Sequence, residues 1–172
     1  TQALDETKNN YIMCIVYIAD RYGVAIADIS TGDYFVTELP DSSRLMDEIY
    51  KFSPSEIICN EAFYMSGMDL DAMRDKLGIT IYSLDSWYFD DAVCKDKLLE
   101  HFKVKNFAGL GLADYDCGII SAGALLIYLF ETQKNSLSNL THITPYITGK
   151  YMLIDSSTRR NLELCETLRE KQ

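Results

Sequence analysis

Three apolar segments near the start of the chain, joined by two short turns that contain glycine, constrain the fold more than any other feature. The segments cover residues 11–19, 24–29 and 33–39, and they are rich in β-branched and aromatic side chains. Gly23 closes the first turn and Gly32 closes the second. Turns this short reverse the chain, so each segment pairs with the next one. The pattern predicts an antiparallel meander of three strands.

Helices and strands are expected to alternate after this meander. Residues 40–43 offer helix caps, Pro54 ends the helix that follows them, and Gly78 ends the next one. Strands separated by helices in this way run parallel within one sheet. The expected fold is therefore α/β, with a ribonuclease-H-like mixed sheet and flanking helices. The predicted helices are 44–52 and 69–77, and the predicted strands are 56–59 and 79–82.

Two further helices complete the predicted domain. The first covers residues 92–102, with Leu98, Leu99 and Phe102 as its buried side. The second covers residues 115–134 and is apolar almost all round. Because a helix without a polar face must be buried on every side, it is expected to be the central packing element.

The last part of the chain is expected to lead into a second domain. Extended segments are predicted at 141–148 and 150–154, and Asp155 is a good N-cap for the helix after them. That helix reaches the end of the chain without a stop signal, so we interpret the sequence as a piece of a longer protein. Its apolar stripe consists of Leu162, Cys165 and Leu168. The predicted units are a domain over 1–135, a linking segment over 136–154 and a truncated helix over 155–172.

Hydropathy and cysteine spacing exclude several classes of protein. The longest apolar stretch without charge, residues 117–130, has 14 residues and is too short for a bilayer span. The five cysteines are at least 23 residues apart, and His101 is far from His142. A zinc site or a disulfide framework needs closer clustering. We therefore expect free thiols in a reducing cytoplasm, no metal site and no membrane association.

The negative charge of the chain limits its direct contact with DNA. The net charge is −10; residues 156–172 carry four basic and three acidic side chains, which leaves −11 on residues 1–155. Binding to a phosphate backbone depends on neutralisation by Lys and Arg. The chain by itself is therefore expected to bind DNA poorly.

Catalytic chemistry is not expected in this chain. A two-metal nuclease with a ribonuclease-H-like fold places a carboxylate on its first strand, but residues 11–19 contain none. Asp28 and Asp33 flank the second turn, where turn formation explains them. No Gly-rich phosphate loop with its Lys and no nucleophile elbow occurs. No catalytic, cofactor-binding or metal-binding residue is nominated.

Two local features have both a structural and a functional interpretation. The aromatic residues 87–89 could form a binding patch, but core and staple positions before a helix are the expected role. His101 is expected on the surface of its helix, because no Ser or Cys can be nominated as its partner.

Four motifs, in order and at compatible spacing along nearly the whole chain, resemble the MutS family of DNA mismatch-repair ATPases. Three are similar to the connector domain (domain II) of that family, and the last is similar to the start of its core, or lever, domain. The motifs are Asn9-Asn10-Tyr11-Ile12, residues 27–32, Ala122-Gly123-Ala124-Leu125 with Tyr128, and the run from Asp155 to Leu164.

The resemblance implies a role as part of a larger machine. The parent would be a homodimer that finds mispaired bases, uses ATP and Mg²⁺ to become a sliding clamp, and recruits MutL. This part would bind no cofactor and catalyse nothing; it would couple mismatch recognition to clamp conversion and contact mismatched DNA only through the full-length protein. The expected location is the bacterial cytoplasm, on the nucleoid when bound to DNA. The alternatives are a metal-dependent nuclease and a protein-interaction module of another family.

Two sets of residues are candidate sites. Asp96 and Lys97, on the expected wet side of the helix at 92–102, are candidates for contact with MutL. The arginine pair 159–160 either bridges the two domains, as the resemblance favours, or pairs with Glu163 and covers apolar surface. The domain-junction motif consists of Asp155, Thr158, Arg159, Arg160, Asn161 and Glu163.

Overall fold

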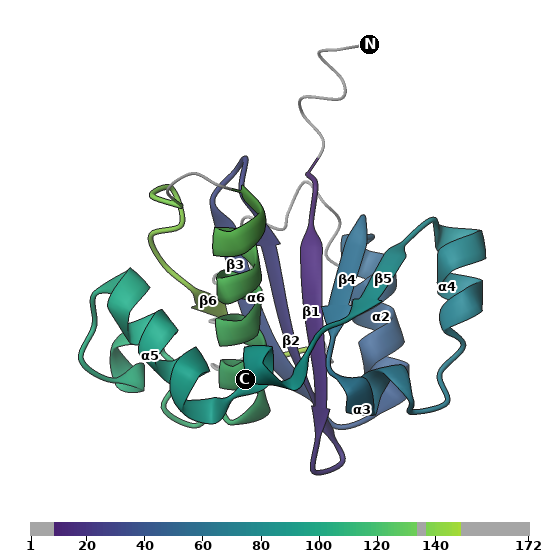
Figure 1. Ribbon diagram of the computed structural model, residues 1–172, viewed down its shortest axis with the longest axis horizontal. Coiled ribbons are helices and arrows are strands. Elements are labelled where there is room, and N and C mark those ends of the chain that lie inside the picture. The colour runs from purple at the N-terminus through teal and green to yellow at the C-terminus, as the bar shows by residue number, and fades with distance from the viewer. Residues whose placement is uncertain (1–8, 134–136, 149–172) are drawn as a thin grey trace, which may run out of the picture.

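The computed structural model describes residues 9–133 and 137–148. In this part of the chain one mixed sheet of six strands has the order β5-β4-β1-β2-β3-β6 (Figure 1). Strands β1 to β3 form the predicted antiparallel meander, with Ile15 opposite Val24 and Ala25 opposite Val36. The pairs β1–β4, β4–β5 and β3–β6 are parallel. The strands are β1 (Ile12–Ile18), β2 (Arg21–Asp28), β3 (Asp33–Leu39), β4 (Glu56–Cys59), β5 (Thr80–Ser83) and β6 (Thr144–Pro145).

Helices cover both faces of the sheet (Figure 1). Side chains alternate along each strand, so Cys14 and Val16 of β1 face one helical layer while Met13 and Ile15 face the other. α5 and α6 pack on the first face, and α2, α3 and α4 pack on the second. The α-helices are α2 (Ser42–Phe52), α3 (Glu61–Tyr64), α4 (Leu70–Leu77), α5 (Asp91–Phe102) and α6 (Cys117–Gln133), and the 3₁₀-helices are η1 (Ser86–Phe89) and η2 (Phe107–Leu110).

The apolar helix α6 is the central packing element of its layer, as predicted. Glycine permits its closest contacts: a Cβ built on Gly23 of β2 would lie 2.2 Å from the Cys117 carbonyl oxygen, and one on Gly123 would lie 2.4 Å from the Cys94 Cβ. No side chain fits at either position without moving the backbone. Gly23 brings α6 onto the sheet, and Gly123 brings α5 onto α6.

The chain after α6 returns to the edge of the sheet. Leu137, Leu140 and Ile143 are buried on the α6 side, and Tyr146 is buried on the other side. β6 is shorter than the extended segment predicted at 141–148. The described part of the predicted linking segment therefore packs on the same body as residues 9–133, whereas 150–154 and the helix after Asp155 lie outside the described residues.

Most predicted elements are confirmed, with small differences at their ends. The expected α/β class and mixed sheet are found, and every predicted helix and strand up to residue 133 is present. The short elements α3, η1 and η2 were not predicted. Leu99 was predicted to be buried but is half-buried, and Cys94 takes the buried position on α5. Among the described helices, none has the length and apolar character needed to cross a bilayer.

Candidate partner-binding surfaces

The two residues nominated on α5 have different surroundings. Asp96 is exposed to solvent. Lys97 is half-buried, and its Nζ lies 3.8 Å from the centre of the Phe130 ring on α6. A cation over an aromatic face is a stabilising contact. Asp96 is therefore accessible at the surface, while Lys97 packs α5 against α6.

Of the three aromatic residues expected at core and staple positions before α5, Tyr88 and Phe89 are half-buried against the core, whereas Trp87 is exposed. The side chain of Trp87 is 49% exposed and stacks on Tyr88, with 4.1 Å between ring centres. The Tyr88 hydroxyl donates a hydrogen bond to the Glu131 carboxylate, and this bond raises the pKa of Tyr88 to about 12. Tyr88 is thus held to α6, and the expectation of a core position is wrong for Trp87.

His101, expected on the surface of its helix, is half-buried and is held by the chain after α6. Its Nε2 lies 2.8 Å from the Leu140 carbonyl oxygen, so the N–H at this position donates to that carbonyl. Its ring meets the Phe130 ring edge-on. His101 therefore links α5 to the segment that leads to β6.

The acidic residues beside the turns have structural partners. Asp28 is 1% exposed, and its carboxylate accepts the backbone N–H groups of Asn10 and Ser30, both at 3.0 Å, and the Ser30 hydroxyl at 2.6 Å. Turn formation explains Asp28, as the sequence indicated. Within residues 9–133 and 137–148, no group of three or more His, Cys, Asp or Glu side chains is placed to hold a metal ion.

The four cysteines in the described residues are buried free thiols. Burial raises the pKa of Cys59, Cys94 and Cys117 to about 12 each, and it raises the pKa of Cys14 as well. The thiolate is the reactive form of cysteine, so these thiols are chemically inert near neutral pH.

A buried polar cluster joins α2 to the segment after β6. Glu48 and Lys51 side chains are only 1% and 8% exposed, and their Oε1 and Nζ atoms are 3.1 Å apart. The Tyr146 hydroxyl donates to Glu48 Oε1 at 2.7 Å. A buried charge needs such partners, because it has lost its water. The cluster fixes the last described strand, and with it the exit of the chain, against α2.

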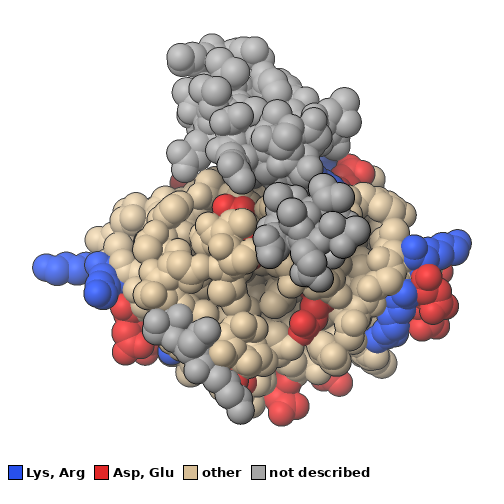
Figure 2. Space-filling view, turned by 90° about the horizontal axis from the view of Figure 1, so that it is seen from above, with Lys and Arg blue, Asp and Glu red and all other residues tan. Residues whose placement is uncertain are grey.

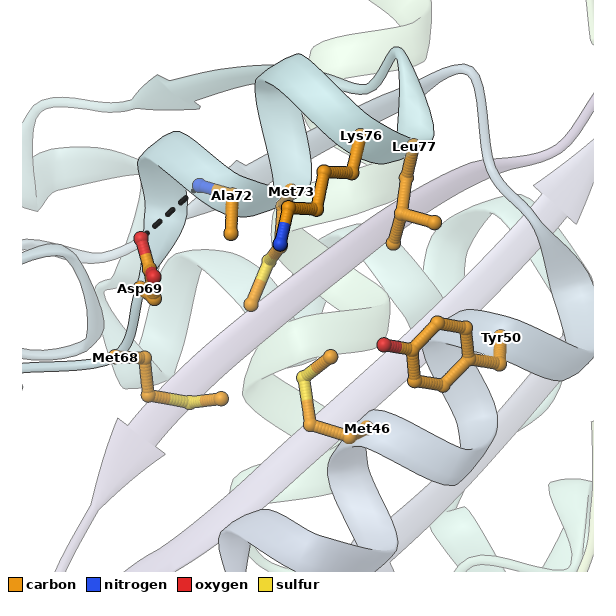
Figure 3. Close-up of a pocket in the computed structure, with 8 residues that line it drawn as sticks. All are labelled: Met46, Tyr50, Met68, Asp69, Ala72, Met73, Lys76 and Leu77. Atoms are coloured by element: carbon orange, nitrogen blue, oxygen red, sulfur yellow. Dashed lines mark hydrogen bonds between the residues drawn. The ribbon is translucent and has the colours of Figure 1, made fainter.

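A groove of about 330 Å³ lies between α2 and α4. Figure 3 shows Met46, Met68 and Met73 directed into the space between the two helices, with Tyr50 and Leu77 at the other end. Ala72, Lys76 and Asp69 complete the lining, and Asp69 caps α4 by accepting the Ala72 N–H at 3.0 Å. The sequence did not reveal this groove. Its only local signal was the pair Met46 and Tyr50, which share one side of a helix.

Charges on the surface are mixed. Figure 2 shows basic side chains beside acidic ones on that face, without a continuous basic patch. Such a surface offers a phosphate backbone little neutralisation.

The domain-junction motif lies outside the described residues. The structure therefore places neither Arg159 nor Arg160, and the choice between a bridge to the next domain and a local ion pair stays a prediction.

Comparison with known proteins gives one consistent result. Residues 10–144 match the family model for MutS domain II. The chain is 54% identical to the DNA mismatch repair protein MutS of Lachnoclostridium phytofermentans over 172 residues, which are 100% of this chain and 18% of that protein. It is 37% identical to MutS of Ruminiclostridium cellulolyticum and 38% identical to MutS of Acetivibrio thermocellus, in each case over 98% of this chain and 19% of the relative. The chain thus spans less than a fifth of the length of these relatives.

Proposed function

This chain belongs to the MutS family as its domain II, and we propose that it is the connector of a DNA mismatch repair protein, a rigid block between the part that reads DNA and the part that hydrolyses ATP. The observation that carries the proposal is the extent of the match. Residues 10–144 run from just before β1 to the first residue of β6, which is nearly all of the packed body. The family domain covers nearly the whole structural unit.

The strand order supports a ribonuclease-H-like fold. β2 alone runs against the other five strands of the described sheet, and β4 and β5 extend the sheet beyond β1. At the middle of β1, where a nuclease of this fold needs a carboxylate, Cys14 and Ile15 are fully buried. We infer a fold that has no catalytic centre of its own, which disfavours the nuclease alternative.

The packing supports a mechanical role. The two layers of helices bury cores on both faces of one sheet, and glycine allows the backbones of α6, β2 and α5 to meet closely. A body packed in this way moves as a unit. Coupling of mismatch recognition to ATP-driven clamp conversion would then occur through reorientation of the whole block.

Other activities of the parent would come from parts beyond this chain. Mismatch binding, ATP and Mg²⁺ binding and the contacts of a homodimer belong there in this proposal. The face of α5 that carries Asp96 would contribute to MutL recruitment. The parent would act in the bacterial cytoplasm, where the chromosome lies.

The test is to replace residues 9–148 in the full-length parent by a flexible Gly/Ser linker. We expect the variant to hydrolyse ATP and to bind mismatched DNA, because both sites lie elsewhere, but to stay at the mismatch when ATP is added. A control linker inserted after residue 148, with the domain kept, separates loss of the domain from loss of rigid attachment. Normal ATP-driven release without the domain would contradict the proposal.

A further inference from the structure

The described chain after α6 is attached to the body by two anchors of different chemistry. The first anchor consists of Leu137, Leu140 and Ile143, which are buried on the α6 side of the sheet. The second anchor consists of β6 and Tyr146, whose side chain is buried on the opposite side. Between them the chain passes the edge of the sheet beside β3 (Figure 1). The two anchors therefore pack on different cores, and each can be attached without the other.

The backbone contributes little to the second anchor. β6 has two residues, and it pairs with β3 at Phe35 and Val36. One of the two, Pro145, has no N–H to donate to the sheet. The Tyr146 N–H donates to the Val36 carbonyl at 3.0 Å. With so short a strand, the attachment depends mainly on the Tyr146 side chain.

The Tyr146 side chain meets a buried ion pair on α2. Its hydroxyl donates to Glu48 Oε1 at 2.7 Å, and the Lys51 Nζ lies 3.1 Å from the same oxygen. The Lys51 Nζ is also 5.2 Å from the centre of the Tyr146 ring. Glu48 and Lys51 lie one turn apart on α2, so they stay neighbours after Tyr146 has left. Both charges would then regain the water that they lost on burial. Opening is therefore opposed less strongly than it would be by an apolar contact of the same size.

We propose that the second anchor is a reversible latch: residues 144–148 leave α2 together, while residues 137–143 and the rest of the body stay folded. Opening adds five residues of free chain to the exit, which span up to about 17 Å when extended. A closed latch makes the exit part of the rigid block, and an open latch lets the following part of the parent move separately. Only this last consequence rests on the proposed function.

Amide hydrogen exchange in the full 172-residue chain tests for a separate opening of the latch. The Tyr146 amide reports on the latch through its bond to Val36, and the amide of the fully buried Leu125 reports on unfolding of the body. After correction for intrinsic rates, we expect the Tyr146 amide to exchange at least about tenfold faster than the Leu125 amide. Low concentrations of urea should accelerate Leu125 strongly and Tyr146 little, because latch opening exposes little surface.

A substitution in α6 separates the latch from the body. Ala124→Gly lies on the α6 side of the sheet, away from the latch, and weakens both the helix and its packing. It should accelerate exchange of the Leu125 amide about tenfold and leave the Tyr146 amide unchanged. Equal acceleration of the two amides would show that the exit opens only when the whole body unfolds, and it would overturn the proposal.

Substitutions in the latch test the role of its charges. Tyr146→Phe alone should accelerate exchange of the amide at residue 146 about tenfold, because the open state no longer costs a hydrogen bond. Glu48→Leu with Lys51→Met and Tyr146→Phe should instead slow it at least about tenfold relative to the wild type, because water no longer stabilises the open latch. Protection of the Leu125 amide shows that each variant is folded.

Exchange at residue 146 as fast in the triple variant as in the wild type would also overturn the proposal, because the buried charges would then not control the opening. Either contrary result would leave the connector function intact, because that function is tested by ATP-driven release of the parent. Failure of the linker experiment would equally leave the exchange rates unchanged.

Discussion

The carboxylate of Glu38, on β3, accepts the backbone N–H of Gly118 at 2.8 Å, in the first turn of α6. It also accepts the N–H of Asp116, and Arg21 lies 3.8 Å from it. A carboxylate at this position satisfies helix N–H groups that have no partner within the helix and offsets the positive end of the helix dipole. A β-strand thus caps the most buried helix of the domain.

Removing this cap should destabilise the whole domain. Glu38→Ala leaves two N–H groups without their acceptor and should lower the free energy of unfolding by about 1–3 kcal/mol. Urea unfolding followed by circular dichroism measures the change. Glu100→Gln, at an exposed position of α5, is the control and should change stability by less than about 0.5 kcal/mol. Equal stability of Glu38→Ala and the wild type would show that the cap is not used in solution.

The buried cluster at Glu48 predicts two effects of different size. Tyr146→Phe removes one hydrogen bond and should cost about 1–2 kcal/mol, because Lys51 remains paired with Glu48. Glu48→Ala leaves the Lys51 ammonium and the Tyr146 hydroxyl without this carboxylate and should cost about 3–5 kcal/mol. Thermal and urea unfolding of both variants measure which substitution lowers the stability more. A larger loss for Tyr146→Phe than for Glu48→Ala would contradict this picture of the cluster.

The buried thiols predict a loss of stability at alkaline pH. Burial raises the pKa of Cys94 from 9.0 to about 12 in the folded chain. Above pH 9 the unfolded chain therefore releases a proton that the folded chain retains, and stability falls as the pH rises toward 12. Each such thiol contributes a slope of up to about 1.4 kcal/mol per pH unit.

Urea midpoints between pH 8 and pH 11 test this dependence. We expect the midpoint to fall across this interval and to fall less steeply in Cys94→Ala. Native alkylation at pH 8 should be slow for all four described cysteines and fast after unfolding. The same slope in the variant as in the wild type would rule out Cys94 as a source of the pH dependence.

A substitution at Asp96 tests partner binding without disturbing the fold. Asp96→Lys in the full-length parent should weaken MutL recruitment about tenfold while mismatch binding stays unchanged, because the side chain is exposed on α5. Lys97→Glu is unsuitable as a partner mutation, since it also removes the contact of Lys97 with the Phe130 ring. Pull-down of MutL on mismatched DNA with ATP measures the effect. Undiminished MutL recruitment by this variant would show that Asp96 is not part of the MutL interface.

The sequence predicted those features that depend on local pattern. The meander follows from three apolar segments and two turns, and Asp41, within the predicted caps at 40–43, caps the helix that follows it. The four-residue helix α3 was missed because its cap, Asn60, also binds the backbone of Tyr17 from 43 residues away. A contact at that separation leaves no periodic signal.

The candidate surfaces were less predictable for the same reason. In the sequence alone, Glu48 is only a polar residue on a helix. Its buried partner, Tyr146, is 98 residues later in the chain. Met46 on α2 is half-buried, because α4 stands apart from α2 there and leaves the groove. The distance between two helices is set by tertiary packing, and no local pattern encodes it.

The most direct test of the rigid connector is a distance measurement by electron spin resonance in the full-length parent. Spin labels at Asp75→Cys on α4 and Glu100→Cys on α5 span the two faces of the sheet, with cysteines outside the described residues replaced by serine. The buried native thiols should stay unlabelled. We expect one distance for this pair without nucleotide, with ADP, with ATP and on mismatched DNA, while the distance from residue 100 to a label in the ATPase part changes with nucleotide. A nucleotide-dependent distance between residues 75 and 100 would contradict the account.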